Sequence, residues 1–146
     1  MEWFECKVSY EKENEDGKIK SIVEAYLVDA MSFTEAEAVI IEEVSSFISG
    51  DCDVKAVKKE KIYEMFKSEN GEGKWFKTKV VFIVTDEITG KEKRTNVTMY
   101  LQTEEIDDVI KELRVNLKGS MADYEIAAVN ETKILQVFEH KEKEEA

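Results

Sequence analysis

The strongest constraint on this 146-residue chain is that its second half repeats the residue pattern of its first half. At one constant offset, Trp3-Phe4 falls on Trp75-Phe76 and Lys7-Val8 falls on Lys79-Val80. The same offset returns near the end of each half, where the matched residues are Asp51 and Asp123, Ala56 and Ala128, Val57 and Val129, Lys61 and Lys133, Ile62 and Ile134, and Phe66 and Phe138. Random identity at a fixed offset runs at roughly 6% per position for ordinary amino-acid usage. The matches favour an internal duplication over a coincidental similarity between two amphipathic α+β segments.

We predict a single domain, residues 1–146, built from two repeats. Its parts are repeat 1 at residues 2–67, a connector at 68–73, repeat 2 at 74–138 and a charged tail at 139–146. Between the matching blocks the offset drifts by a residue or two, so that Tyr26-Leu27 aligns with Tyr100-Leu101. Each repeat alone has only about seventy residues, which is marginal for an independent core. We therefore expect the two repeats to pack together about a pseudo-twofold axis.

The first repeat has the pattern of a hairpin, a helix and an extended segment. Alternation predicts a strand over residues 2–11, and the Asp16-Gly17 turn returns a second strand over 18–29. The residues expected to face the core are Phe4, Cys6, Val8 and Tyr10 in the first strand and Val23, Ala25 and Leu27 in the second. Ser32 or Thr34 is the predicted N-cap of a helix that Gly50 ends. Residues 53–66 are predicted to be extended, with a bulge or a break near Lys58-Lys59.

The second repeat has the same order. A long strand begins near Phe76, a turn at 86–90 follows, and residues 92–102 form the returning strand. Thr103 is the predicted N-cap of the second helix, Gly119 ends it, and residues 123–138 form the last extended segment. The sequence therefore predicts an α+β fold: a β-β-α-β unit repeated in tandem, with a mostly antiparallel sheet and both helices on one face.

Composition and charge limit the partners and the cellular compartment that we expect for this protein. A hydrophobic content of 42% is normal for a globular core, whereas a net charge of −12 favours basic partners and repels phosphate backbones. The N-terminal residues lack the pattern of a signal peptide, and the longest apolar run, Val80–Val84, suits a strand and not a membrane span. Cys6 and Cys52 lack CxxC spacing and are expected to be free thiols. We expect a cytoplasmic protein with no membrane association.

Several blocks of the sequence, in the same order, resemble a known family. These blocks are Trp3–Val8, Tyr26–Ala30, Ser32–Ala38, Ile41–Glu43, Phe47–Gly50 and Met121–Tyr124. The family consists of small uncharacterised proteins with a domain of unknown function, found in Bacteroides-like gut bacteria and their phages. The resemblance covers nearly the whole chain and implies a cytoplasmic origin in such a bacterium or phage. It supplies no catalytic residues.

The residue types that carry catalysis or bind metals are sparse. The single histidine, His140, lies in the predicted tail, so a histidine-rich metal site or a histidine general base is not expected. Asp51-Cys52-Asp53 offers two carboxylates and a thiol, but an EF-hand loop needs further oxygen ligands, and solvated turn residues explain the pattern equally well. A GxSxG motif and a glycine-rich phosphate loop are both absent from the sequence. We predict no enzyme activity, no metal and no cofactor.

One candidate surface is aromatic and basic. If Phe4 and its alternate neighbours face the core, the opposite sheet face presents aromatic and basic residues from both repeats. These residues are Trp3, Lys7, Lys20, Tyr26, Trp75, Lys77, Lys79, Arg94 and Tyr100. Outward aromatics with lysines resemble the stacking platforms that bind single-stranded nucleic acid. The alternative is that the tryptophans are buried, which Val81 and Ile83 on the same side of their strand favour.

The other candidate surface is acidic. The first helix carries Glu35, Glu37, Glu42 and Glu43, and residues 21–54 contain no lysine or arginine. Such a surface could dock a basic protein, mimic a nucleic-acid backbone to inhibit a DNA-binding enzyme, or serve only to keep the protein soluble. We predict a non-enzymatic binding or adaptor module that engages an unidentified protein partner. Single-strand nucleic-acid binding is the alternative function, disfavoured by the net charge, and a homodimer is compatible with either.

Overall fold

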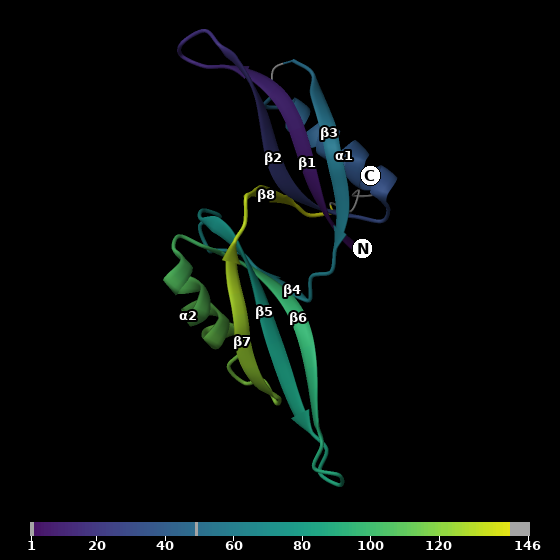
Figure 1. Ribbon diagram of the computed structural model, residues 1–146, viewed down its shortest axis with the longest axis vertical. Coiled ribbons are helices and arrows are strands. Elements are labelled where there is room, and N and C mark those ends of the chain that lie inside the picture. The colour runs from purple at the N-terminus through teal and green to yellow at the C-terminus, as the bar shows by residue number, and fades with distance from the viewer. Residues whose placement is uncertain (1, 49, 141–146) are drawn as a thin grey trace, which may run out of the picture. The chain divides into compact units, whose positions relative to one another are not determined.

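The computed structural model describes residues 2–48 and 50–140, and its fold is α+β (Figure 1). Its ten elements are β1 (Glu2–Glu13), β2 (Ile19–Ala30), α1 (Phe33–Ser45), β3 (Cys52–Glu60), β4 (Glu64–Phe66), β5 (Lys74–Thr85), β6 (Glu92–Thr103), α2 (Ile106–Asn116), β7 (Asp123–Glu131) and β8 (Ile134–Phe138). Each predicted terminal extended segment is divided into two strands, so the order is β-β-α-β-β twice. The first division falls at residues 61–63 and not near Lys58-Lys59. Of the predicted tail, residues 141–146 lie outside the described part.

The strands form two four-stranded sheets that belong to two compact units. Sheet A has the order β3-β1-β2-β8, and sheet B has the order β4-β6-β5-β7. Unit 1 consists of the chain up to Lys61 together with the chain from Lys133 on, and unit 2 spans Ile62–Thr132. Each sheet therefore takes its last strand from the other half of the sequence, since β8 pairs in parallel with β2 and β4 pairs in parallel with β6. The unit boundaries, after Lys61 and after Thr132, thus differ from the predicted repeat boundaries at residues 67 and 74.

Chain geometry explains why β4 does not join sheet A. The open edge of β2 lies three strand spacings from β3, which is about 14 Å. From Glu60 to Glu64 the chain advances by four residues, which span at most about 14 Å. Glu60 lies level with Asp29, whereas the strand beside β2 begins level with Ala25, so the chain would also have to return about 13 Å along the sheet. The chain cannot return across the sheet in that length, so the free position beside β2 is filled by β8.

The two units have the same strand register. Both hairpins pair antiparallel along their whole length. The strand on the other side of each hairpin has a bulge: β3 opposite Lys7/Val8 in unit 1, and β7 opposite Lys79/Val80 in unit 2. The register corrects one alignment: Cys6 faces Tyr26 and Thr78 faces Met99, so Tyr26 corresponds to Met99 and not to Tyr100. Descent of both units from one duplicated segment stays a prediction.

Each helix covers one face of its own sheet and closes a separate core. In unit 1 the core contains Phe4, Cys6 and Val8 as predicted, but from β2 it takes Tyr26, Val28 and Ala30. The prediction that Val23, Ala25 and Leu27 face this core is wrong, because their alternate neighbours in β2 point toward α1. Ala25 and Leu27 are nevertheless buried, at 7% and 0% exposed, on the other face of sheet A, whereas Val23 is 59% exposed. In unit 2 the core residues are Phe76, Val80, Met99, Leu101, Val109, Leu113 and Leu117.

The helix ends agree only partly with the sequence predictions. Ser32 caps α1, accepting a hydrogen bond from the Glu35 N–H at 3.1 Å. The N-cap of α2 is Glu105, which makes no side-chain capping bond, so the prediction of Thr103 is wrong. Gly50 lies beyond the C-cap of α1, Ser46, although it does have a positive φ of 98°. Within residues 2–48 and 50–140, neither helix has the length and apolarity needed to cross a bilayer.

Candidate functional site

The four glutamates of α1 do not share one face of the helix. At about 100° per residue, Glu42 lies on the side away from the core, whereas Glu37 and Glu43 border the buried stripe of Ala36 and Ile40 on its two sides. Glu37 and Glu42 are exposed, and Glu43 is half-buried. The charge is therefore distributed around α1, with Glu37 and Glu42 as its most accessible members.

Glu35 is engaged near the start of α1. One of its carboxylate oxygens accepts a hydrogen bond from the Met31 N–H at 3.2 Å, and the other lies 3.6 Å from His140 Nδ1. Its side chain therefore reaches back to the residue before the N-cap, an arrangement related to the capping box. This stabilises the start of the helix, so Glu35 contributes less than Glu37 and Glu42 to the accessible surface.

Exposed apolar side chains accompany these acids. Ile41 lies between Glu37 and Glu42 on the helix and is 43% exposed, and Phe47, just after the helix, is 53% exposed. The helix contains no lysine or arginine, and Glu37, Glu42 and Glu43 make no ion pair within the described residues. We define the α1 outer surface as Glu37, Ala38, Ile41, Glu42 and Ser45, all of which are exposed.

The predicted aromatic platform is not accessible. Trp75, Tyr26 and Tyr100 are 3%, 1% and 1% exposed, and Trp3 is half-buried. Tyr26 is also on the wrong face, because it packs in the core beneath α1 and stacks on Phe138 at 5.8 Å between ring centroids. Burial, the alternative that Val81 and Ile83 favour, therefore holds for Trp75, whereas Trp3 is half-buried. Tyr26, Trp75 and Tyr100 offer no exposed ring on which a base could stack.

The predicted basic residues have separate environments. Lys7 and Lys20 are exposed on unit 1, and Arg94 on unit 2 forms ion pairs with Glu92 and Glu125. Lys77 and Lys79 line a cavity on sheet B together with two asparagines, Asn96 and Asn130. Nothing in the sequence marks these asparagines as neighbours, because the pairing of β5 with both β6 and β7 brings them together.

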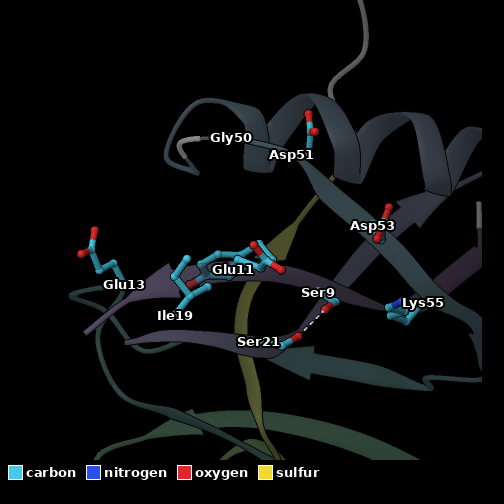
Figure 2. Close-up of a pocket in the computed structure, with 10 residues that line it drawn as sticks. Ser9, Glu11, Glu13, Ile19, Ser21, Gly50, Asp51, Asp53 and Lys55 are labelled. Atoms are coloured by element: carbon cyan, nitrogen blue, oxygen red, sulfur yellow. Dashed lines mark hydrogen bonds between the residues drawn. The ribbon is translucent and has the colours of Figure 1, made fainter. Parts of the chain in front are cut away.

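Unit 1 has an acidic hollow at the hairpin end of sheet A (Figure 2). It has a volume of about 670 Å³. On its floor, Ser9 of β1 and Ser21 of β2 are diagonal neighbours, with hydroxyl oxygens 3.2 Å apart. Its charged lining residues are Glu11, Glu13, Asp51, Asp53 and Lys55. Within the described residues, no three histidine, cysteine or acidic side chains are grouped so that they could hold a metal ion, and this includes Asp51-Cys52-Asp53.

Unit 2 has a larger groove between α2, β4 and the connector. Its volume is about 860 Å³, and the α2 residues that line it are Asp108, Lys111, Glu112, Val115 and Asn116. The opposite wall consists of residues 65–70 and Glu72. Gly73 holds the end of the connector against β6, since a Cβ there would lie 2.6 Å from the Thr103 carbonyl oxygen. The sequence patterns do not predict this groove.

The remaining titratable groups in unit 1 favour structure over reactivity. Burial raises the pKa of the Cys6 thiol to about 11, with smaller contributions from the charges of Glu5 and Glu37. The thiol is therefore protonated at neutral pH and is a poor nucleophile. The Glu24 carboxylate accepts hydrogen bonds from Tyr10 at 2.7 Å and from Tyr26 at 2.6 Å.

Comparison with known proteins gives one match. A family model described as "Domain of unknown function (DUF4494)" matches residues 2–140. No curated protein and no solved structure matches the chain. The resemblance to a family with a domain of unknown function is confirmed, whereas an origin in Bacteroides-like bacteria or their phages stays a prediction.

Proposed function

We propose that this chain, which belongs to the DUF4494 family of unknown function, is a non-enzymatic cytoplasmic binding module whose α1 outer surface docks a basic segment of a partner protein. The observation that carries the proposal is the position of an exposed Ile41 between Glu37 and Glu42, in a helix without a basic residue. Apolar contact contributes affinity, and the unpaired carboxylates select and orient a basic partner.

A solvated surface kept acidic for solubility would account for the glutamates but not for the exposed apolar side chains. Isolated apolar residues on a surface are common. Here, however, Ile41 lies among the acids, and Phe33 and Phe47, at the two ends of α1, remain 52% and 53% exposed while their rings contact Phe4 and Tyr26 of the core. Exposed apolar side chains rimmed by charges are typical of surfaces that bind proteins.

A random peptide library panned on the immobilised protein tests this proposal even though the partner is unidentified. We expect the selected peptides to combine lysine or arginine with apolar residues. In Glu37→Lys/Glu42→Lys, their affinity should fall about tenfold or more, since two favourable charge contacts become repulsive. Binding to the wild type should also weaken with added salt.

The control carries the same charge change elsewhere. Glu69→Lys/Glu72→Lys alters two exposed acids in the connector of unit 2 and should leave peptide affinity unchanged. Circular dichroism would show that both double variants keep their helix content. Selection of peptides that bind the Glu37→Lys/Glu42→Lys variant as tightly as the wild type would contradict the proposal, as would a selection with no basic enrichment.

A further inference from the structure

The cavity on sheet B differs in charge from the rest of this acidic protein. It lies on the sheet face opposite α2, because Lys79 alternates with the core residue Val80 along β5. Its volume is about 260 Å³. Its lining residues are Lys77, Thr78, Lys79, Asn96, Val97, Thr98, Ala128 and Asn130. None of them is acidic, whereas the hollow of unit 1 and the groove beside α2 each contain several carboxylates.

Three polar side chains of this cavity, Lys79, Asn96 and Asn130, are available to a ligand. Lys79 makes no ion pair within the described residues, and the amides of Asn96 and Asn130 make no hydrogen bond there. The nearest carboxylates along β7 are already neutralised, because Glu131 pairs with Lys74 at 3.1 Å and Glu125 pairs with Arg94. The ammonium charge of Lys79 is therefore not cancelled by its neighbours on the strand.

The corresponding position of unit 1 lacks this set of polar groups. There Lys7 occupies the place of Lys79, but it faces Ala25 where Lys79 faces Thr98. Val23 likewise stands where unit 2 has Asn96. The lysine is therefore present in both units, whereas the hydroxyl of Thr98 and the amide of Asn96 are replaced in unit 1 by the apolar side chains of Ala25 and Val23.

We propose that the sheet B cavity binds a small oxyanion, a carboxylate or a phosphate group. The Lys79 ammonium supplies the charge, and the side-chain amides of Asn96 and Asn130 donate hydrogen bonds to the anion oxygens. The volume lies just below the range of about 300–1,000 Å³ for drug-sized ligands, which restricts the ligand to a small molecule or to one anionic group of a larger one. The bulge beside Lys79 is of the kind that re-aims side chains next to binding sites. This site is independent of the α1 outer surface.

The test is an NMR titration of the full chain with inorganic phosphate and, separately, with acetate, at constant ionic strength set by chloride. We expect saturable shifts of the Lys79 backbone amide and of the Asn96 and Asn130 side-chain amides, with a Kd in the millimolar range for at least one anion. Saturation by phosphate alone would identify a phosphate group as the ligand, and saturation by acetate alone a carboxylate.

Two variants decide whether the cavity is responsible. Lys79→Met should weaken binding about tenfold or more, and Lys7→Met, at the matched position of unit 1, should leave it unchanged. Asn130→Leu should also weaken binding while keeping the lysine. The core signals of Val80 and Leu101 report whether each variant is folded. The proposal is overturned if neither anion gives saturable shifts, if Lys79→Met binds as the wild type does, or if chloride alone produces the same shifts.

Discussion

The two units share a register but have diverged in the residues that it places together. Counting from the buried pairs Val44/Leu113 and Ile48/Leu117, Phe47 of unit 1 corresponds to Asn116 of unit 2. Phe47 packs near Tyr26, with ring centroids 6.3 Å apart, whereas Asn116 lines the groove beside α2. The same backbone position thus carries a half-exposed aromatic side chain beside Tyr26 in one unit and a polar side chain of the groove wall in the other.

The polar network of unit 1 shows the same divergence inside the sheet. Glu24 and Tyr26, joined by a hydrogen bond, correspond by register to Val97 and Met99, which cannot form one. Both cores contain aromatic rings, but only unit 1 adds a carboxylate that is held by two tyrosines, whereas unit 2 has Val97 and Met99 at the matching positions. The difference teaches that the backbone pattern tolerates two kinds of core, and that each unit should respond differently to the same perturbation.

The largest effect should come from removing β8. A chain that stops after Thr132 loses Ile134, which is 6% exposed, and the stacking of Phe138 on Tyr26. Deleting two such side chains destabilises a core by about 4 kcal/mol or more, and the edge of β2 also loses its partner. We therefore expect unit 1 to unfold while unit 2, which contains all of its own strands, stays folded.

Methyl NMR signals of Val28 and Leu101 during urea unfolding would separate the two units. A chain that stops after His140 keeps β8 and serves as the control. If Val28 kept its native signal without β8, unit 1 would not need the exchanged strand. If both units unfolded together, the strand exchange would couple them into one cooperative system.

A smaller effect is expected from Tyr26→Phe, which removes only the hydroxyl. The charged Glu24 carboxylate then accepts one hydrogen bond from a tyrosine and not two. We expect this to lower the free energy of unfolding of unit 1 by about 1.5 kcal/mol. In unit 2, Tyr124→Phe alters a half-buried tyrosine that makes no hydrogen bond within the described residues, so its effect should be smaller. Equal losses in the two units would show that the Glu24 network contributes nothing specific.

The pH dependence of stability tests the same network. The pKa of Tyr26 is raised by burial and then by its hydrogen bond to Glu24, and the pKa of Tyr10 is raised chiefly by its hydrogen bond to Glu24. A raised pKa means that the folded state favours the neutral phenol, so this stability is fully present below about pH 10 and declines as the pH rises above it. As the pH rises above about 10, the free energy of unfolding measured with urea should fall for unit 1 before it falls for unit 2. Tyr26→Phe should reduce that difference.

Local patterns predict the elements of this fold but not which strands pair across the sequence. Alternation and turn residues identify both hairpins, and the apolar spacing identifies both helices, because each signal lies within a dozen neighbouring residues. The exchange of β4 and β8 depends instead on a connection too short to cross a sheet, which no residue type marks. The position of Tyr26 follows from the register of β2, and Trp75 is buried although it alternates with the core residue Phe76. Alternation alone therefore could not test the aromatic surface predicted from the sequence.

The smallest effect concerns the helix starts, where the two units differ by one hydrogen bond. Ser32 caps α1 through its side chain, whereas Glu105 at the same position of α2 does not. Ser32→Ala should therefore lower the stability of unit 1 by about 1 kcal/mol, and Glu105→Ser should raise that of unit 2 by a few tenths to about 1 kcal/mol. The gain in unit 2 is expected to be smaller than the loss in unit 1, because Asp107 and Asp108 already stabilise the start of α2 through the helix dipole. Urea midpoints from the Val28 and Leu101 signals would measure both changes. A loss in unit 2 on Glu105→Ser would mean that Glu105 stabilises α2 by a contact other than capping.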